Sequence, residues 1–373
     1  MNLMSPQKVL FLSPSMQGKG GVVDFCQMLI ENLDPSFEVD HFIVANRPGN
    51  RNVLKRLNYL LGDFLKLRKR LKSHRYSLVH LNPSFKILAM IRDGLYMMLI
   101  NRFYPQRILV IFHGWDSRLA AKMTKNPFYR TLVNKTYKKA AMILVLASEF
   151  KHQLEKMDFC PERIKVITTM YQGNFEKKKN DGTGTNSRIY LLFISRFVEA
   201  KGIYIAAQVV KLLVDHGYKD FYFFFAGDGP EYDGLKNYVE KNRLEDYVRM
   251  TGFITGEEKR NILEGSDILL FPTHYGEGCP VVLLEAMGAG LAVISTPIAA
   301  IPEIVENNKN GFIIDSMDPK DFFEAARNLL EDKELLKKFQ DQNREKAKKN
   351  YEASVVTRKI ETLYTAVIEN EKV

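Results

Sequence analysis

The sequence predicts an α/β protein built from two halves, each a parallel sheet covered by helices. First, short runs rich in β-branched and aromatic residues alternate with longer helical patterns, as in successive βαβ units. Second, this alternation stops in a polar, glycine-containing segment at 172–188 and then starts again. Third, the length of 373 residues suits a chain of two domains. We therefore expect two Rossmann-like halves in tandem.

The first half is expected to hold six strands. The run KVLFLSP is apolar almost throughout, which is typical of a strand buried on both faces, and a glycine turn and a helix from about Val22 follow it. Helical patterns separate most of the later runs. The predicted strands are 8–14, 37–45, 77–83, 107–113, 141–147 and 165–169.

The segment 172–188, QGNFEKKKNDGTGTNSR, lacks apolar periodicity and is predicted to be an exposed linker. Five further strands are expected after it, at 189–195, 221–226, 249–253, 267–273 and 292–296, and long helices at 319–350 and 353–369. The predicted domain bounds are 1–171, 172–188 as linker, 189–350, and a C-terminal helix in 351–373.

Composition narrows the class of protein. With 46% hydrophobic and 26% charged residues, wholesale disorder is excluded. The cysteines Cys26, Cys160 and Cys279 have neither metal-ligand spacing nor a disulfide pattern, which favours a cytoplasmic location. We expect no signal peptide and no spanning helix, which would need about 20 apolar residues. A net charge of +10 favours anionic partners.

The stretch GEGCPVVLLEAMGAG at 276–290 is the most informative. Pro280 suits the first turn of a helix, 281–289 should be that helix, and Gly290 should end it. The strand 267–273 precedes it, so the turn lies at the carboxyl end of a parallel strand, where open α/β sheets bind ligands. Free N–H groups suited to a phosphate are expected at Gly278, Cys279, Val281 and Val282.

Two acids, Glu277 and Glu285, bracket this helix start. Carboxylates repel a phosphate but accept hydrogen bonds from hydroxyl groups. A ligand with hydroxyl groups on both sides of a phosphate group fits a nucleotide sugar. The alternative interpretation is two surface acids that happen to lie near glycines.

The pattern E-G-x-P-x-x-x-x-E-A-M-x-x-G resembles the E-x7-E signature of retaining glycosyltransferase family 4, which has the GT-B fold. The resemblance implies two Rossmann-like domains facing across a cleft, with the C-terminal helix returning to the N-terminal domain. It also implies that Glu277 contacts the donor sugar and Glu285 the nucleotide ribose.

Four other motifs extend the resemblance over nearly the whole chain. SRFVEAKG resembles the motif whose Arg and Lys bind the donor diphosphate, here Arg196 and Lys201. FAGDGP resembles the family's next glycine turn, with Gly227, and GKGGV resembles its N-terminal glycine loop, with Gly20 and Gly21. HGWD places His113 where the family often has a histidine near the donor sugar, although a histidine at a strand end is often only a hydrogen-bonding residue.

The absence of certain motifs weakens several other functional interpretations. No D-x-D occurs, so we expect no metal ion on the diphosphate and no cofactor besides the donor. The basic residues Arg196 and Lys201 would neutralise the charge of the diphosphate in place of a metal ion. Neither G-x-G-x-x-G nor a P-loop occurs, which weakens dehydrogenase and ATPase interpretations.

The expected reaction retains the anomeric configuration through attack on the face that the diphosphate leaves. The leaving diphosphate oxygen would take the acceptor proton, and closure about 172–188 is expected to accompany donor binding. The donor is expected to be a UDP or GDP sugar of hexose type. The acceptor is expected to be a saccharide or a lipid-linked precursor in lipopolysaccharide, polysaccharide or glycolipid assembly.

The segment 51–75 holds nine Lys or Arg and one acid, Asp63. Its apolar positions, close to helical spacing, are Leu54, Leu57, Leu61, Leu65 and Leu71. A basic amphipathic helix can lie on the anionic inner face of a membrane, which would make the protein peripheral. Equally, it can pack its apolar face on the sheet and leave its basic face in water.

Other functions remain as alternatives: a nucleotide-sugar epimerase, a phosphorylase, or another nucleotide-sugar-binding protein of GT-B fold. The two acids disfavour the epimerase, and a phosphorylase of the pyridoxal type would be much longer. A non-catalytic module is disfavoured by Arg196, Lys201, Glu277 and Glu285 together. Nucleic acid is not an expected partner, because no basic motif with interleaved aromatic residues occurs.

Overall fold

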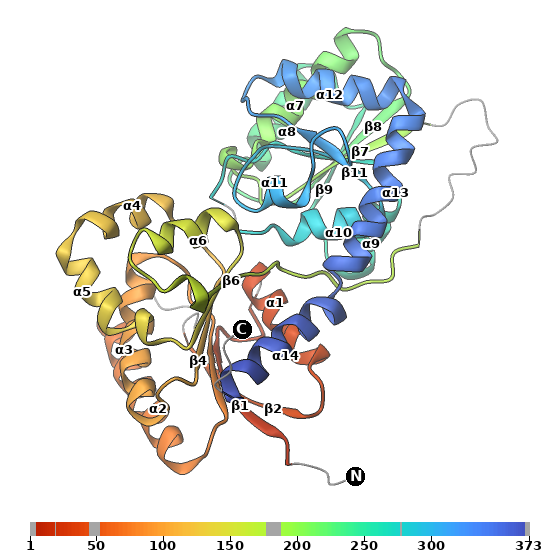
Figure 1. Cartoon of the computed structure of the whole chain (residues 1–373). Coiled ribbons are helices and arrows are strands. Elements are labelled where there is room, and N and C mark those ends of the chain that lie inside the picture. Colours follow the sequence, from red (N-terminus) through yellow and green to blue (C-terminus); the bar gives the residue numbers. More distant parts are fainter. Residues whose placement is uncertain (1–4, 19, 45–52, 177–187, 277, 370–373) are drawn as a thin grey trace. The chain divides into compact units, whose positions relative to one another are not determined.

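The computed structural model describes residues 5–18, 20–44, 53–176, 188–276 and 278–369, and within them the side chains from 59 onward in the helix that starts at Val53 (Figure 1). The described residues form two compact units. The first takes them from Met1–Met170, Gly276–Cys279 and Ala353–Val373, and the second from Tyr171–Tyr275 and Pro280–Glu352. Each unit contains a parallel sheet with helices, which confirms the predicted fold class. The sequence-based domain bounds stay a prediction, and most of 172–188 lies outside the described residues.

The first unit is built on a six-stranded parallel sheet in the order β2-β1-β3-β4-β5-β6. Its strands are β1 (Gln7–Ser13), β2 (Phe37–Ile43), β3 (Leu78–Leu81), β4 (Ile108–Phe112), β5 (Met142–Val145) and β6 (Ile164–Val166). All six correspond to predicted strands. The chain order reverses between β1 and β3, so the loops that follow these strands diverge and leave room at the carboxyl edge of the sheet.

Helices cover both faces of the first sheet, with α1 and α14 on one side and α2 and α3 on the other (Figure 1). The helices are α1 (Gly21–Asn32), α2 (Val53–Ser73), α3 (Ile87–Phe103), α4 (Ser117–Lys125), α5 (Pro127–Lys135), α6 (Ser148–Glu155) and α14 (Ala353–Glu369), with short 3-10 turns at Tyr137–Lys139 and Pro161–Arg163. The buried residues Val356, Ile360 and Tyr364 of α14 join the core of β1, β3 and β4. The C-terminal helix therefore belongs to the first unit, as expected.

The second unit has a parallel sheet in the order β12-β11-β10-β7-β8-β9. Its strands are β7 (Ile189–Ile194), β8 (Phe221–Ala226), β9 (Val248–Gly252), β10 (Ile268–Phe271), β11 (Ala292–Ser295) and β12 (Gly311–Ile313). Five of them were predicted. The sixth, β12, was missed because three residues are too few to show a period of two.

The second unit's helices are α7 (Ile203–Asp215), α8 (Tyr232–Lys241), α9 (Gly256–Glu264), α10 (Val281–Ala289), α11 (Ile301–Ile304), α12 (Pro319–Glu331) and α13 (Lys333–Asn350), with a 3-10 turn at Glu199–Lys201. Helix α12 packs on α7, and α13 packs on α10. The single helix predicted over 319–350 is wrong. It breaks at Asp332, whose carboxylate accepts a hydrogen bond from the Leu335 backbone N–H at 2.8 Å and caps α13.

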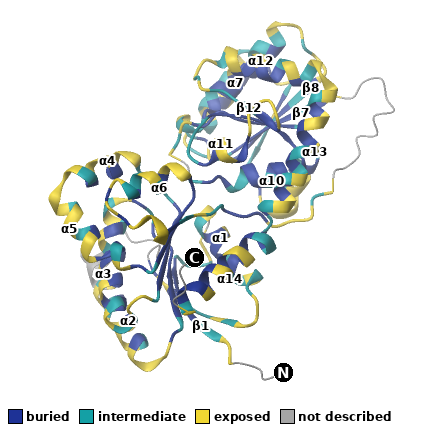
Figure 2. Ribbon diagram, in the orientation of Figure 1, coloured by how far each residue is buried: buried dark blue, intermediate teal, exposed yellow. Residues whose placement is uncertain are grey.

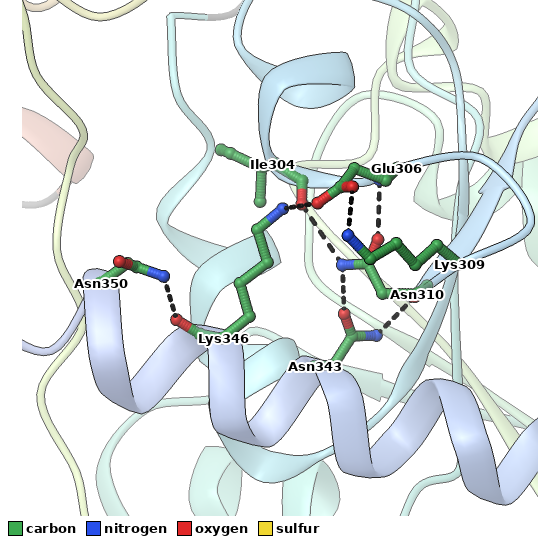
Figure 3. Close-up of polar contacts among 7 residues, drawn as sticks. All are labelled: Ile304, Glu306, Lys309, Asn310, Asn343, Lys346 and Asn350. Atoms are coloured by element: carbon green, nitrogen blue, oxygen red, sulfur yellow. Dashed lines mark hydrogen bonds and ion pairs between the residues drawn. The ribbon is translucent and has the colours of Figure 1, made fainter.

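A buried amide pair anchors α13 to the loop after α11 (Figure 3). The Asn310 Nδ2 donates to Asn343 Oδ1 at 2.7 Å, and Asn343 Nδ2 donates to the carbonyls of Asn310 and Leu291 at 2.8 and 2.7 Å. Beside them, Glu306 pairs with Lys309 and Lys346 at 2.6 and 2.7 Å. Hydrogen bonds from these two lysines lower the pKa of Glu306 to about 2. The network satisfies buried polar groups, so its role is to hold the packing around β11.

The apolar stripe predicted along α2 is wrong in part. Leu71 is buried, but Leu61 and Leu65 are 64% and 63% exposed. Figure 2 shows exposed as well as buried residues along α2. Residues 65 and 71 are six positions apart, which is about 240° around a helix of 3.6 residues per turn, so they lie on different sides. The side chains of Leu54 and Leu57 lie outside the described residues. Within the described residues, the structure contains no helix of the length and apolar character that crossing a membrane requires.

Candidate functional site

The order in which the chain adds strands to the second sheet reverses between β7 and β10. The chain moves outward from β7 through β8 to β9, returns to β10 beside β7, and then moves outward the other way. Loops that follow β7 and β10 at their carboxyl ends therefore diverge, and such points bind ligands in open α/β sheets. Arg196 follows β7, and Tyr275 follows β10.

Two basic side chains lie over the same aromatic ring at this point. The Lys201 Nζ lies 4.6 Å from the centroid of the Tyr275 ring, and the Arg196 guanidinium carbon lies 5.9 Å from it. The structure thus brings together the two basic residues that the sequence singled out. Tyr275 was missed, and an aromatic residue ahead of a glycine turn carries no signal that would have identified it.

Close backbone approaches hold the loop that carries these cations. The Phe197 N–H donates to the Asp228 carbonyl at 2.8 Å, in the turn after β8. A Cβ on Gly227 would lie 1.9 Å from the Ser195 carbonyl oxygen, and one on Gly202 would lie 2.0 Å from the Pro272 oxygen. Only glycine fits at either place, so Gly227 and Gly202 allow the neighbouring loops to position Arg196 and Lys201.

Helix α10 begins in the same unit, after β10. Pro280 is its N-cap, with φ −67° and ψ 119°, so it precedes the first turn instead of lying in it as predicted. The N-cap makes no side-chain hydrogen bond, and the first N–H groups of a helix, here those of Val281 and Val282, have no partner within the helix. Together with the helix dipole, these donors favour an anion at the helix start. Gly290 ends α10 in the left-handed conformation at φ 81°, which confirms the predicted end.

Glu285 lies on the second turn of α10 and forms an ion pair with Lys259 of α9. The Lys259 Nζ is 2.7 Å from Glu285 Oε1 and 2.6 Å from Oε2. The side chains are 28% and 15% exposed, so the pair is largely shielded from solvent. Lys259 was missed, since nothing in the pattern GEEKRN distinguishes it from any other lysine on a helix surface.

Gly278 and Cys279, expected to contribute phosphate-binding N–H groups, belong to the first unit and pack against its other residues. A Cβ on Gly278 would lie 2.8 Å from the His113 carbonyl oxygen. The Thr169 hydroxyl donates to the Cys279 carbonyl at 3.0 Å. Glu277 lies outside the described residues, so its predicted role stays a prediction.

His113 lies at the carboxyl end of β4, buried between Phe25 and Asn82. Its ring centroid is 4.8 Å from that of Phe25. The Asn82 amide donates from Nδ2 to the Leu12 carbonyl at 3.2 Å, which turns its Oδ1 toward His113 Nε2, 2.7 Å away. The Nε2 therefore carries the proton and Nδ1 is an acceptor. Burial lowers the pKa of His113 to about 3, so the ring is neutral.

The glycine loop after β1 leads into α1. Gly20 is the N-cap of α1 at φ +123°, a conformation that favours glycine, and Gly21 is the first helical residue. A Cβ on Gly20 would meet no atom within 4 Å, so conformation and not space calls for glycine there. The loop thus presents backbone groups at the place where the order of the first sheet reverses.

Burial of His113 makes stability depend on pH. Its pKa is about 3 in the folded protein and about 6.5 in the unfolded chain, so between these values only the unfolded chain binds the proton. We expect the free energy of unfolding to fall below pH 6.5 by about 1.4 kcal/mol per pH unit through this histidine. Urea unfolding between pH 6.5 and 5, where most carboxylates stay ionised, measures it. His113→Asn should reduce the slope by this amount and leave the share of the buried His80, whose pKa burial also lowers. The exposed His152→Asn should leave the slope unchanged; equal slopes in all three proteins would contradict the assignment.

Two family descriptions match the two halves of the chain. "Glycosyltransferase Family 4" matches residues 16–170, and "Glycosyl transferases group 1" matches residues 174–346. Together they extend over both units.

Curated relatives are consistent with these family descriptions. The chain is 27% identical over 268 residues to the putative colanic acid biosynthesis glycosyltransferase WcaL of Escherichia coli (strain K12), covering 70% of this chain and 64% of that protein. It is 26% identical over 275 residues to the N-acetyl-alpha-D-glucosaminyl L-malate synthase of Bacillus anthracis, covering 71% and 69% of the two chains. The match to WcaL thus leaves about a third of that relative's length outside it.

Solved structures show the fold. A sucrose-phosphate synthase from Thermosynechococcus elongatus superposes with a TM-score of 0.77 at 15% identity, covering 98% of this chain and 100% of that one. Anabaena HepE, in complex with UDP and glucose, superposes with a TM-score of 0.73 at 16% identity, covering 96% and 100%. The expected two-domain GT-B fold is confirmed.

Proposed function

Since the chain belongs to the family 4 glycosyltransferases of GT-B fold, we propose that it transfers a hexose-type sugar from a nucleotide diphosphate sugar to a hydroxyl group of a saccharide or lipid-linked acceptor. One observation carries the proposal: Arg196 and Lys201 converge on the Tyr275 ring where the order of the second sheet reverses. Two cations at such a point suit a diphosphate. The relative named for colanic acid biosynthesis supports a role in polysaccharide, lipopolysaccharide or glycolipid assembly.

The proposed reaction retains the anomeric configuration. The bond between the anomeric carbon and the diphosphate oxygen breaks, and the acceptor oxygen forms its new bond on the same face. The acceptor proton passes to the leaving diphosphate oxygen. Charge grows on that leaving group in the transition state, where Arg196, Lys201 and the first N–H groups of α10 stabilise it. Glu277 is proposed to orient the sugar.

The remaining donor contacts are proposed as follows. Neutral His113 accepts a hydrogen bond from a sugar hydroxyl at Nδ1, and Gly20, Gly21, Gly227, Gly278 and Cys279 contribute backbone groups. Glu285 accepts hydrogen bonds from the ribose. The donor base is UDP or GDP type, and no metal ion or other cofactor is required. HepE, which binds UDP, supports a uridine donor.

Nucleotide release tests the function. The purified chain is incubated with UDP and GDP sugars, first with water and then with saccharide acceptors, and the freed nucleoside diphosphate is measured. We expect release from one class of donor, full activity in EDTA, and retention of configuration in the product by NMR. An altered sugar without nucleotide release would favour the epimerase alternative. Activity lost in EDTA and restored by Mg²⁺ or Mn²⁺ would overturn the metal-free proposal.

Lys259 should affect donor binding through Glu285. The ion pair holds the carboxylate in place, and Lys259→Met would leave a largely shielded carboxylate without this cation. We expect the donor KM to rise by about tenfold and kcat to change less, because ribose contacts act equally in ground and transition states. Lys259→Arg should recover most of the loss. As a control, Lys236→Met removes an exposed pair with Glu240 and should leave KM unchanged. A KM that is unaltered in Lys259→Met would refute the coupling.

Membrane association is part of the proposal. The basic segment 51–75, most of it in α2, is proposed to bind the anionic inner face of a membrane, which makes the protein peripheral and brings it to lipid-linked acceptors. The exposed residues Lys66, Arg68, Lys69 and Lys72 support this electrostatic contact.

A further inference from the structure

Helix α3 of the first unit, ILAMIRDGLYMMLINRF, is apolar nearly all the way round. Its charged residues are Arg92, Asp93 and Arg102. A helix of this kind is normally buried on every side. Here one side is in the core, since Met90, Tyr96, Met97 and Ile100 are at most 1% exposed. The opposite side is open.

The open side forms a continuous apolar line, which we call the α3 stripe: Leu88, Ile91, Leu95 and Met98. These residues are 78%, 36%, 42% and 50% exposed. Their spacings of three, four and three residues place them along one side of the helix. The neighbouring helix α2, which packs on α3, also carries two exposed leucines, Leu61 and Leu65. Large exposed apolar side chains gathered on one surface mark an interface.

Exposed charge around the α3 stripe has a single sign. Between Tyr59 and Tyr104 the only acids are Asp63 and Asp93, and both are buried. Asp93 pairs with Arg92 at 2.7 Å. The exposed charged residues of this region are all basic: Lys66, Arg68, Lys69, Lys72, Arg75, Lys86 and Arg102. An apolar line flanked by basic residues complements a surface that has an apolar interior layer and anionic groups on its outer side.

We propose that the α3 stripe inserts into an anionic lipid bilayer at the boundary of headgroups and acyl chains, with the basic residues of α2 and the ends of α3 at the lipid phosphates. Lysine and arginine stems can lie along the apolar layer while their heads reach the phosphates. A second copy of this chain is the less favoured occupant, because a two-fold contact would bring the same basic surround against itself. The inference deepens the proposed function, since it specifies how the enzyme reaches lipid-borne acceptors.

Insertion differs from electrostatic binding through α2 in a measurable way. Leu88→Gln combined with Leu95→Gln removes apolar surface at unchanged charge. Co-sedimentation with phosphatidylcholine vesicles containing phosphatidylglycerol should show wild-type binding and a partition coefficient lowered by about tenfold or more in the double variant. The matched control, Phe253→Gln with Met317→Gln, changes two exposed apolar residues of the second unit and should bind like wild type. Far-UV circular dichroism confirms that all variants fold.

Three outcomes would overturn the proposal. Wild-type protein that fails to bind the vesicles, or a double α3 variant that binds as wild type does, excludes insertion. A wild-type dimer without vesicles that the double variant converts to monomer, seen by analytical ultracentrifugation, assigns the stripe to a second copy. The vesicle assay contains no donor, so nucleotide release measured separately shows whether the proposed enzymatic function survives when this inference fails.

Discussion

Replacing Lys201 with methionine is expected to lower kcat by a factor of about 10²–10³. Methionine keeps most of the length of the lysine side chain but removes the charge that lies over the Tyr275 ring. The proposed diphosphate gains negative charge as it leaves, so a cation beside it acts more in the transition state than in the bound donor. The loss should therefore appear in kcat, with a smaller change in donor KM, in steady-state measurements of nucleotide release.

Lys211→Met is the matched control, because Lys211 lies on α7, the helix that follows Lys201, and pairs with Asp215 at the surface. It should retain wild-type kcat. Arg196→Met should resemble Lys201→Met, and the double variant should lose less than the product of the single losses, since both cations act on one group. A Lys201→Met enzyme with wild-type kcat would refute the proposed diphosphate site.

The second large effect is expected on stability, from Gly202→Ala. Gly202 has φ +79°, where an alanine costs about 1–2 kcal/mol. In addition, its Cβ would lie 2.0 Å from the Pro272 carbonyl oxygen, a backbone atom that cannot move without displacing the end of β10. We expect the free energy of unfolding to fall by about 4 kcal/mol or more, measured by urea unfolding.

Gly217 is the control that separates the cost of positive φ from the cost of the close approach to Pro272. Its φ of +83° is nearly the same, but a Cβ there would meet nothing within 4 Å. Gly217→Ala should therefore cost only the conformational part, about 1–2 kcal/mol. Equal losses for the two variants would show that the Pro272 approach contributes nothing. Because Gly202 directly follows Lys201, Gly202→Ala should also lower kcat, whereas Gly217→Ala should not.

Some predictions from sequence were confirmed because they depend on local patterns. The eleven predicted strands are β-branched or aromatic runs between turn residues, and each was found. Helix α10 and its end at Gly290 follow from an apolar run that stops at a glycine able to adopt positive φ. Arg196 and Lys201 could be identified because each lies in a motif directly after a strand.

Other predictions failed where local pattern and tertiary contact conflict. The break at Asp332 was missed because residues on both sides favour helix, and the capping carboxylate acts through one backbone hydrogen bond. The α2 leucines were assigned to one stripe from approximate spacing, although Leu65 and Leu71 lie on different sides. The open side of α3 gave no signal, because an apolar helix looks the same in sequence whether one side or all sides are covered.

The amino-acid sequence thus determined which segments form strands and helices, the division into two α/β halves, and the basic residues proposed to bind a diphosphate. These depend on residues close together along the chain. Folding decided that Tyr275 lies against both cations and that Lys259 pairs with Glu285, 26 residues away. It also buried His113 beside Asn82 and left the α3 stripe exposed. Such contacts join residues distant in sequence, and their energies depend on burial and approach, which arise only when strands and helices pack together.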